Sequence, residues 1–118
     1  MTVRSSNDQV RAALEKVWID SRPEVLSRLA TIESFLAALE SGKSNHASRL
    51  AAQSAAHRLS GSLGMFGLDK ASTCASEIES MLLHAEGSQV TKIAEFLREL
   101  RNMIERRESQ DPGRIVHP

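Results

Sequence analysis

The sequence predicts an all-α protein, an antiparallel up-down four-helix bundle with an accessory N-terminal helix. The 118 residues contain no Tyr, one Trp and three Phe, and only three prolines interrupt the chain. Apolar residues recur at intervals of three and four, which is the spacing of a helix with one buried side. The segments between these stretches are short, so successive helices are expected to run antiparallel.

The first expected helix covers residues 7–19, with an apolar stripe of Val10, Leu14 and Val17. The sequence DSRP at 20–23 is expected to end it, because proline lacks the N–H that a helix interior requires. Pro23 suits the first turn of the next helix. Residues 1–22 are therefore expected to form an N-terminal helix and turn, and residues 23–107 the bundle.

The helices of the bundle follow from four further apolar stripes. The second helix of the bundle is expected to run from about Ser44 to Met65, with Gly67 as its C-terminal cap. Asp69 is expected to cap the third helix of the bundle. Turns are expected at 41–45 and 86–88. The stripes are Val25, Leu29, Ile32, Leu36 and Leu39; Ala52, Ala55, Leu59, Leu63 and Phe66; Ala71, Ala75, Ile78 and Leu82; and Val90, Ile93, Leu97, Leu100 and Ile104.

The composition excludes several classes of protein. The 15 basic and 15 acidic residues give a formal net charge of zero, which argues against binding to nucleic acid. No apolar run is long enough to cross a membrane, and the first residues lack the apolar block of a signal peptide. The single cysteine, Cys74, fits a reducing compartment. We expect a cytoplasmic protein that binds neither nucleic acid nor membrane, with a flexible tail at residues 108–118.

One histidine stands out in residues 55–67, which read AAHRLSGSLGMFG. Helical residues advance by about 100° each, and this places the apolar stripe of the helix opposite His57. His57 is therefore expected to point away from the core, and so are the residues on its own side. These are Leu50, Gln53, Ser54, Ser60, Gly61 and Gly64.

The two glycines on the histidine side predict an approach by another molecule. Glycine costs about 1 kcal/mol relative to alanine inside a helix. Gly61 and Gly64 lie away from the expected packing side, so close helix packing does not account for them, and they are expected to clear space beside the imidazole. Leu50, an exposed leucine on the same side, is a candidate for the apolar part of a docking surface.

The role that remains for His57 is that of a nucleophile, which attacks a group that another protein delivers. None of the four histidines follows a glutamate at the spacing of a bundle metal site, and Cys74 has no second cysteine, so no metal is expected. Neither a substrate cavity nor an orienting carboxylate next to His57 is evident for general-base catalysis. The sequence also lacks a phosphate-binding loop and a serine nucleophile elbow.

The segment AHRLSGSLGMFGL resembles the phosphorylation site of bacterial histidine-containing phosphotransfer (HPt) domains. Their pattern has an apolar residue two positions after the histidine, a glycine at plus four, a small residue at plus five and often a glycine at plus ten. The matching residues here are His57, Leu59, Gly61, Ser62 and Gly67. The resemblance covers about residues 18 to 107 and includes the SEIESML stretch of the next helix.

This resemblance implies a carrier in a phosphorelay. His57 would accept a phosphoryl group from the aspartate of a response-regulator receiver domain and return it or pass it to another receiver. The resemblance implies that the receiver supplies Mg²⁺, acidic residues and a lysine, and that the carrier has no cofactor and no kinase or phosphatase site of its own. A hybrid histidine kinase is a further candidate partner, and a monomer is expected.

One position departs from the family pattern. Many HPt domains have a lysine at plus three, where this chain has Ser60, a hydrogen-bond donor without charge. Arg58 lies about 100° from His57 around the helix and is either a substitute cation or a solvated surface residue. Gln53 and Ser54 precede His57 by about one turn. Gln53 is a candidate to orient the imidazole or the phosphoryl oxygens, with an exposed polar residue as the alternative.

Two other functions compete with the phosphocarrier. The same bundle would also serve as an interaction module that docks receivers or other signalling proteins without being phosphorylated. A histidine-kinase fragment would present a histidine as well, but such fragments usually follow it with an acidic residue and a turn containing proline. Arg58 follows here, and no proline appears between His57 and Pro112.

Overall fold

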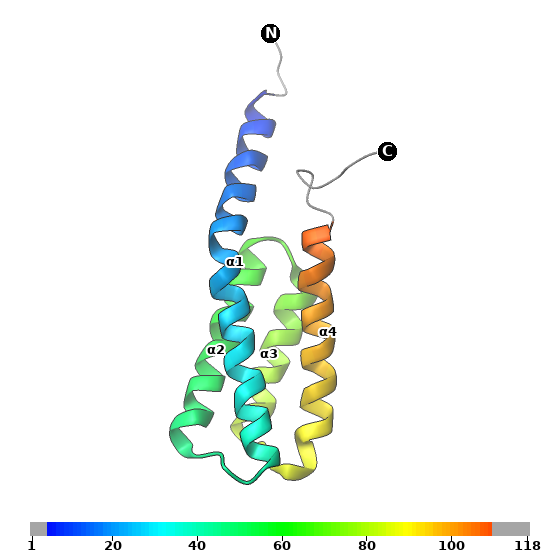
Figure 1. Ribbon diagram of the computed structural model, residues 1–118. Helices are drawn as coiled ribbons and strands as arrows, with labels where there is room; N and C mark the ends of the chain where they lie inside the picture. The colour runs from blue at the N-terminus through cyan, green and yellow to red at the C-terminus, as the bar shows by residue number, and fades with distance from the viewer. Residues whose placement is uncertain (1–4, 110–118) are drawn as a thin grey trace.

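The computed structural model describes residues 5–109 and forms a four-helix bundle (Figure 1). Each helix runs antiparallel to the one before it, and no strand occurs among residues 5–109. The prediction of an all-α up-down bundle is confirmed. Its elements are α1 (Ser5–Glu40), α2 (His46–Met65), α3 (Asp69–Leu83), the short 3₁₀ helix η1 (Gly87–Gln89) and α4 (Val90–Ser109).

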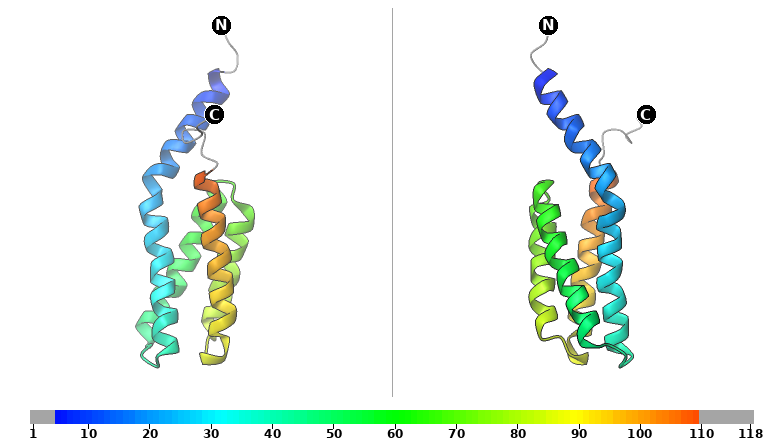
Figure 2. Two further views of the ribbon diagram at one scale, coloured as in Figure 1. Left: turned by 45° about the vertical axis from the view of Figure 1, so that its right-hand side comes forward. Right: turned by 90° about the vertical axis from the view of Figure 1, so that its left-hand side faces the viewer.

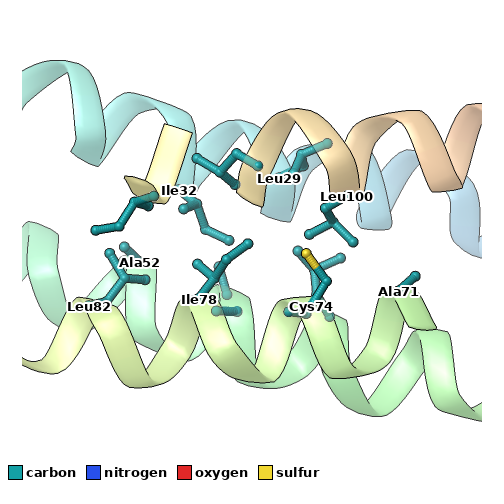
Figure 3. Packing of buried hydrophobic residues seen from close by; sticks show 14 of the residues in the cluster. Leu29, Ile32, Ala52, Ala71, Cys74, Ile78, Leu82 and Leu100 are labelled. Carbon is teal, nitrogen blue, oxygen red and sulfur yellow. The ribbon is translucent and has the colours of Figure 1, made fainter. Parts of the chain in front are cut away.

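The core lies along the bundle axis and is built from the four stripes predicted for residues 23–107, with Leu39, Phe66 and Val90 partly buried at its margin. The stripe predicted for residues 7–19 lies outside it, because Val10, Leu14 and Val17 are exposed. Figure 3 shows aliphatic side chains of all four helices meeting there, with the small Ala52 of α2 and, at one end of the cluster, Ala71 of α3. Small residues let the backbones of α2 and α3 approach closely, and large ones fill the remaining space. The side chains without exposed area include Leu29, Ile32, Ala52, Leu59, Leu63, Ile78, Leu82, Ile93, Leu100 and Ile104.

The prediction of a separate N-terminal helix is wrong, because α1 continues through Pro23 as one helix of 36 residues. A proline inside a helix costs about 3 kcal/mol. Contacts made before the proline offset this cost. Trp18 is 1% exposed and packs edge-on against Phe66, with ring centroids 5.1 Å apart. The guanidinium of Arg107 lies 4.7 Å from the centre of the Trp18 ring and pairs with Glu15 at 2.9 Å.

Pro23 leaves a bend in α1 in place of a break. The two views of Figure 2 show the N-terminal part of α1 leaning over the ends of the neighbouring helices. Bends of this kind arise where proline removes a backbone hydrogen bond. The division of the chain at residues 22 and 23 therefore falls inside a helix, and the division into three segments stays a prediction.

The ends of α2 follow local sequence rules. Asn45 caps its first turn: the Asn45 side chain accepts from the Ser48 N–H at 2.8 Å, and the Asn45 N–H donates to Ser48 Oγ at 3.0 Å. Gly67 follows the last turn with a φ of 76°, which confirms the predicted glycine cap. The predicted cap of α3 is wrong, because Asp69 is the first residue of the helix and Leu68 precedes it without a side-chain cap.

Two ion pairs attach α4 to α1. Arg101 donates to both carboxylate oxygens of Glu33, and Arg107 does the same to Glu15. Helix α4 continues to Ser109, two residues into the predicted tail, and residues 110–118 of that tail lie outside the described residues. Within residues 5–109, no helix has the length and apolar character needed to cross a membrane.

Candidate functional site

His57 lies on the exposed side of α2, as the sequence predicts. The opposite side of the helix is buried and consists of Ala52, Ala55, Ala56, Leu59 and Leu63. The side chain of His57 is 75% exposed. Burial of the alanines and leucines fixes the rotation of α2 about its axis, and this rotation holds the imidazole in solvent.

A carboxylate from the neighbouring helix α3 contacts the imidazole. His57 Nδ1 lies 3.2 Å from both Oε1 and Oε2 of Glu79, whose side chain is 33% exposed. Because a carboxylate only accepts hydrogen bonds, Nδ1 carries the proton in this contact and the lone pair of the neutral ring is on Nε2. The expectation that no orienting carboxylate lies next to His57 is therefore wrong. Glu79 was missed because the contact joins residues 22 positions apart on two helices.

Gln53 has a different partner from the one expected. Its Nε2 donates to the Leu82 carbonyl at 3.3 Å, and Arg49 donates to the same carbonyl and to that of Ala85. The Leu82 carbonyl belongs to the last turn of α3, where carbonyls have no partner within the helix, and Ala85 lies two residues beyond its end. Gln53 thus caps α3, and the group that orients the imidazole is Glu79.

Ser60 and Gly64 face α3 near its N-terminus. Ser60 Oγ lies 3.3 Å from Ser72 Oγ, and the Ser72 hydroxyl donates to the Ser60 carbonyl at 2.8 Å. A Cβ atom at Gly64 would lie 3.3 Å from Ser72 Oγ. The interpretation of Gly64 as clearance for a partner therefore needs correction, because this glycine allows the close packing of α2 against α3.

Gly61 behaves as the sequence predicts. A Cβ atom there would meet nothing within 4 Å, so the glycine borders open space one turn after His57. Ser54 is also exposed on this side, and Arg58 is exposed about 100° further around the helix.

Exposed apolar side chains surround the histidine. Leu50 is 49% exposed, and Met65, at the other end of α2, is 64% exposed. Leu83 is 56% exposed and follows Glu79 by one turn of α3, so both lie on the same side of that helix. We call this surface the His57 face. It comprises Leu50, Ser54, His57, Gly61 and Met65 of α2 with Glu79 and Leu83 of α3.

Comparison with known families identifies this arrangement. The model of the Hpt domain family matches residues 16–110, which is most of the chain and includes His57 and Glu79. The chain belongs to the Hpt domain family. Hpt domains carry out histidine phosphotransfer in phosphorelays and partner with response-regulator receiver domains.

A relative of this Hpt domain is Protein RcaC of Microchaete diplosiphon. It is 30% identical over 77 residues, which are 65% of this chain and 12% of that protein. The chain thus spans about an eighth of the length of this relative. Comparison with solved structures gives no significant match.

The Hpt domain also contains a cysteine, another side chain with nucleophilic character, between α3 and α4. Cys74 of α3 is 6% exposed, and its thiol donates to the Phe96 carbonyl of α4 at 3.3 Å. Burial, and then the charges of Glu99 and Glu77, raise the pKa of Cys74 from 9.0 to about 11. Among residues 5–109, no three histidine, cysteine or acidic side chains gather closely enough to hold a metal ion.

Proposed function

We propose that this Hpt domain is a phosphocarrier that accepts a phosphoryl group on His57 from the aspartate of a receiver domain and gives it to the same or another receiver. The observation that supports it best is the contact of His57 Nδ1 with Glu79 on an exposed helix face. An imidazole held in this way has its lone pair on the nitrogen that a partner protein can reach.

The transfer uses the two ring nitrogens differently. The Nε2 lone pair attacks the phosphorus of the aspartyl phosphate, the new N–P bond forms, and the P–O bond to the aspartate breaks with its electrons on the carboxylate. The ring then carries a positive charge, and its Nδ1 proton stays in the hydrogen bond to Glu79. A carboxylate at this position stabilises that charge, as an acidic partner does for a catalytic histidine. The return transfer reverses these steps.

Glu79 also keeps the carrier ready to give up the phosphoryl group. If Nδ1 lost its proton, the group that leaves phosphorus would be an imidazolate anion, which is a poor leaving group. With the proton retained, neutral imidazole leaves. The same contact therefore assists transfer in both directions, and the direction depends on which receiver is phosphorylated.

The remaining charge stabilisation comes from the partner. Ser60 is engaged with Ser72, and Arg58 lies about 100° from His57, so neither of these two positions places a cation directly beside the imidazole. Phosphoryl transfer depends on positioning and on neutralising the phosphoryl charge. The receiver would supply Mg²⁺ and a lysine, and the carrier requires no cofactor. That receiver could belong to a hybrid histidine kinase.

The His57 face would dock the receiver. Leu50 and Leu83 offer apolar area, and Gly61 leaves the space beside the imidazole open. An apolar surface with a polar centre suits an interface that must bring a charged group to one atom and then release its partner. We expect a cytoplasmic monomer, because the four helices close their own core.

The experiment that tests the function is transfer from a panel of phosphorylated receiver domains to the wild type and to His57→Gln. We expect acid-labile, base-stable phosphate on the wild type alone, attached to Nε2 by NMR. His57→Gln is expected to fold normally, because the side chain is largely exposed. Phosphate on His57→Gln would refute the site. Binding of a receiver without transfer would favour the interaction module.

A further inference from the structure

The apolar stripe of α1 is longer than the bundle that covers it. Trp18 and Val25 of this stripe are each 1% exposed. One turn before Trp18, Leu14 is 48% exposed, and its neighbours Val10 and Val17 are 59% and 43% exposed. These three residues lie at intervals of four and three, so they form one side of the helix.

The lengths of the helices explain why this side is uncovered. With 1.5 Å per residue, the 36 residues of α1 span about 54 Å and the 20 residues of α2 about 30 Å. We call residues 7–17 of α1 the arm. The arm passes the end of α2, and Figure 2 shows that the N-terminal part of α1 leans over the ends of α2 and α3.

The arm is attached to the bundle at its base. Glu15 pairs with Arg107 of α4 at 2.9 Å, and both side chains are about four-fifths buried, with exposed fractions of 21% and 18%. Trp18 packs on Phe66 directly after α2. These contacts hold the base of the arm in a defined direction, so its apolar side is presented in a fixed place relative to α2.

The base of the arm lies next to one end of the His57 face. Phe66, which contacts Trp18, follows Met65, and the exposed Met65 belongs to the His57 face. Met65 lies eight residues after His57, or about 12 Å along α2. A partner large enough to cover both His57 and Met65 therefore reaches the place where the arm leaves the bundle.

We propose that the arm, through Val10, Leu14 and Val17, is a second contact surface for the receiver domain that docks on His57. This inference rests on the proposed function. It extends the docking surface from α2 and α3 to a segment of α1 that makes no contribution to the chemistry, so the arm would help to select among receivers.

The amount of apolar area favours a receiver over a second copy of this chain. A stable interface buries about 800 Å² on each partner. Three half-exposed aliphatic side chains supply only a fraction of that area, which is too little for a dimer held by the arms alone. The same area added to the His57 face would strengthen a transient complex, and aliphatic contacts without buried charge allow it to dissociate quickly.

The test compares Leu14→Asn, which changes the arm, with Ile19→Asn, which changes its base. Leu14 and Ile19 are 48% and 47% exposed, and they lie about 140° apart around α1, so only Leu14 shares the side of Val10 and Val17. Using a receiver that phosphorylates the wild type, we expect Leu14→Asn to raise the receiver Kd about 3- to 10-fold. The transfer rate at saturating receiver should not change. Ile19→Asn should stay within about twofold in both quantities.

Four outcomes decide the proposal. A larger Kd for Leu14→Asn alone supports it, provided that both variants show the wild-type melting temperature. Equal Kd values for Leu14→Asn, Ile19→Asn and the wild type would overturn it while leaving the phosphocarrier intact. A wild-type dimer that Leu14→Asn converts to a monomer, with the receiver Kd unchanged, would assign the arm to a second copy. A wild type that binds no receiver would refute the docking on His57 and the arm together.

Discussion

His57 and Cys74 are nucleophiles on adjacent helices of one small bundle, and their surroundings have opposite effects. His57 is exposed, and the Glu79 carboxylate contacts its ring at 3.2 Å. Cys74 is buried between α3 and α4, and burial together with the charges of Glu99 and Glu77 raises its pKa to about 11. Glutamates lie near both groups, but only one of the two nucleophiles is available for reaction.

The difference lies in the charge that each group acquires when it reacts. In the proposed transfer the imidazole would become positive as Nε2 forms a bond, so a nearby carboxylate would stabilise the product. The thiol must become a negative thiolate before it attacks, so nearby carboxylates oppose the reaction, and burial opposes it further. In the proposed transfer, Glu79 of α3 would thus assist His57, whereas burial and the charges of Glu99 of α4 and Glu77 of α3 suppress Cys74.

The largest expected effect concerns the suppressed nucleophile. With its pKa raised from 9.0 to about 11, Cys74 has about 100-fold less thiolate near pH 8 than a free cysteine, so its alkylation by iodoacetamide should be at least about 100-fold slower. The rate should still rise as the pH approaches 11. Because the folded state favours the thiol, this group contributes to stability below pH 9, and the contribution should disappear as the pH rises from 9 through 11. Alkylation at the rate of a free cysteine would show that Cys74 is accessible.

The next effect concerns the activated nucleophile. Glu79→Gln keeps a hydrogen-bond acceptor near Nδ1 and removes the charge, so we expect the rate of transfer to His57 to fall about 10- to 100-fold. Rapid-quench measurements at saturating receiver would give this rate. The receiver Kd should change little.

Glu77→Gln is the matched control, two residues earlier on α3. It should leave the transfer rate unchanged and lower the pKa of Cys74, because Glu77 is one of the charges that raise it. Glu79→Gln should leave the alkylation profile of Cys74 unchanged. Equal transfer rates in Glu79→Gln and Glu77→Gln would mean that the contact with the imidazole only orients the ring.

Substitutions of Gly61 should have a smaller effect, and they separate the receiver's access to His57 from the stability of α2. Gly61→Ala and Gly61→Leu both replace glycine in a helix where a Cβ atom meets nothing, so each should raise the free energy of unfolding by up to about 1 kcal/mol. Only leucine is bulky enough to obstruct the receiver, and we expect a Kd about 5- to 10-fold higher for Gly61→Leu alone. Calorimetric titration with the receiver would measure it. An unchanged Kd would show that the space beside His57 is not used.

The sequence predicted the elements that depend on local rules. Helical periodicity located the buried side of each helix within residues 23–107, and the rotation of α2 followed from Leu59 and Leu63 opposite His57. The family pattern carried the functional hypothesis. Predictions that depended on a single local signal were wrong where contacts from distant segments outweighed it. Pro23 was expected to end a helix, but Trp18 and Glu15 hold the preceding segment on the bundle.

The missed site residues have the same cause. Glu79, the partner of Gln53 and the close packing at Gly64 all depend on which residues of α2 and α3 lie opposite each other. Periodicity predicts the side of the helix on which a residue lies. It does not predict the residue's height, which is its position along the bundle axis relative to the neighbouring helix. The connection from Phe66 to Leu68 sets that height, and nothing in the sequence of α2 alone specifies it.

The smallest expected effect tests the departure of Ser60 from the family pattern. Ser60→Lys would give up the contact with Ser72 and extend a cation from the half-buried edge of α2. A cation near the phosphoryl group should slow the hydrolysis of phosphohistidine about 2- to 3-fold and leave the transfer rate within twofold, since the receiver already supplies charge at that step. Ser60→Met is the matched control, because it loses the same contact and has similar length without charge. If both variants lengthen the phosphohistidine lifetime equally, shielding from water is responsible. If neither does, the charge at this position has no influence on the lifetime.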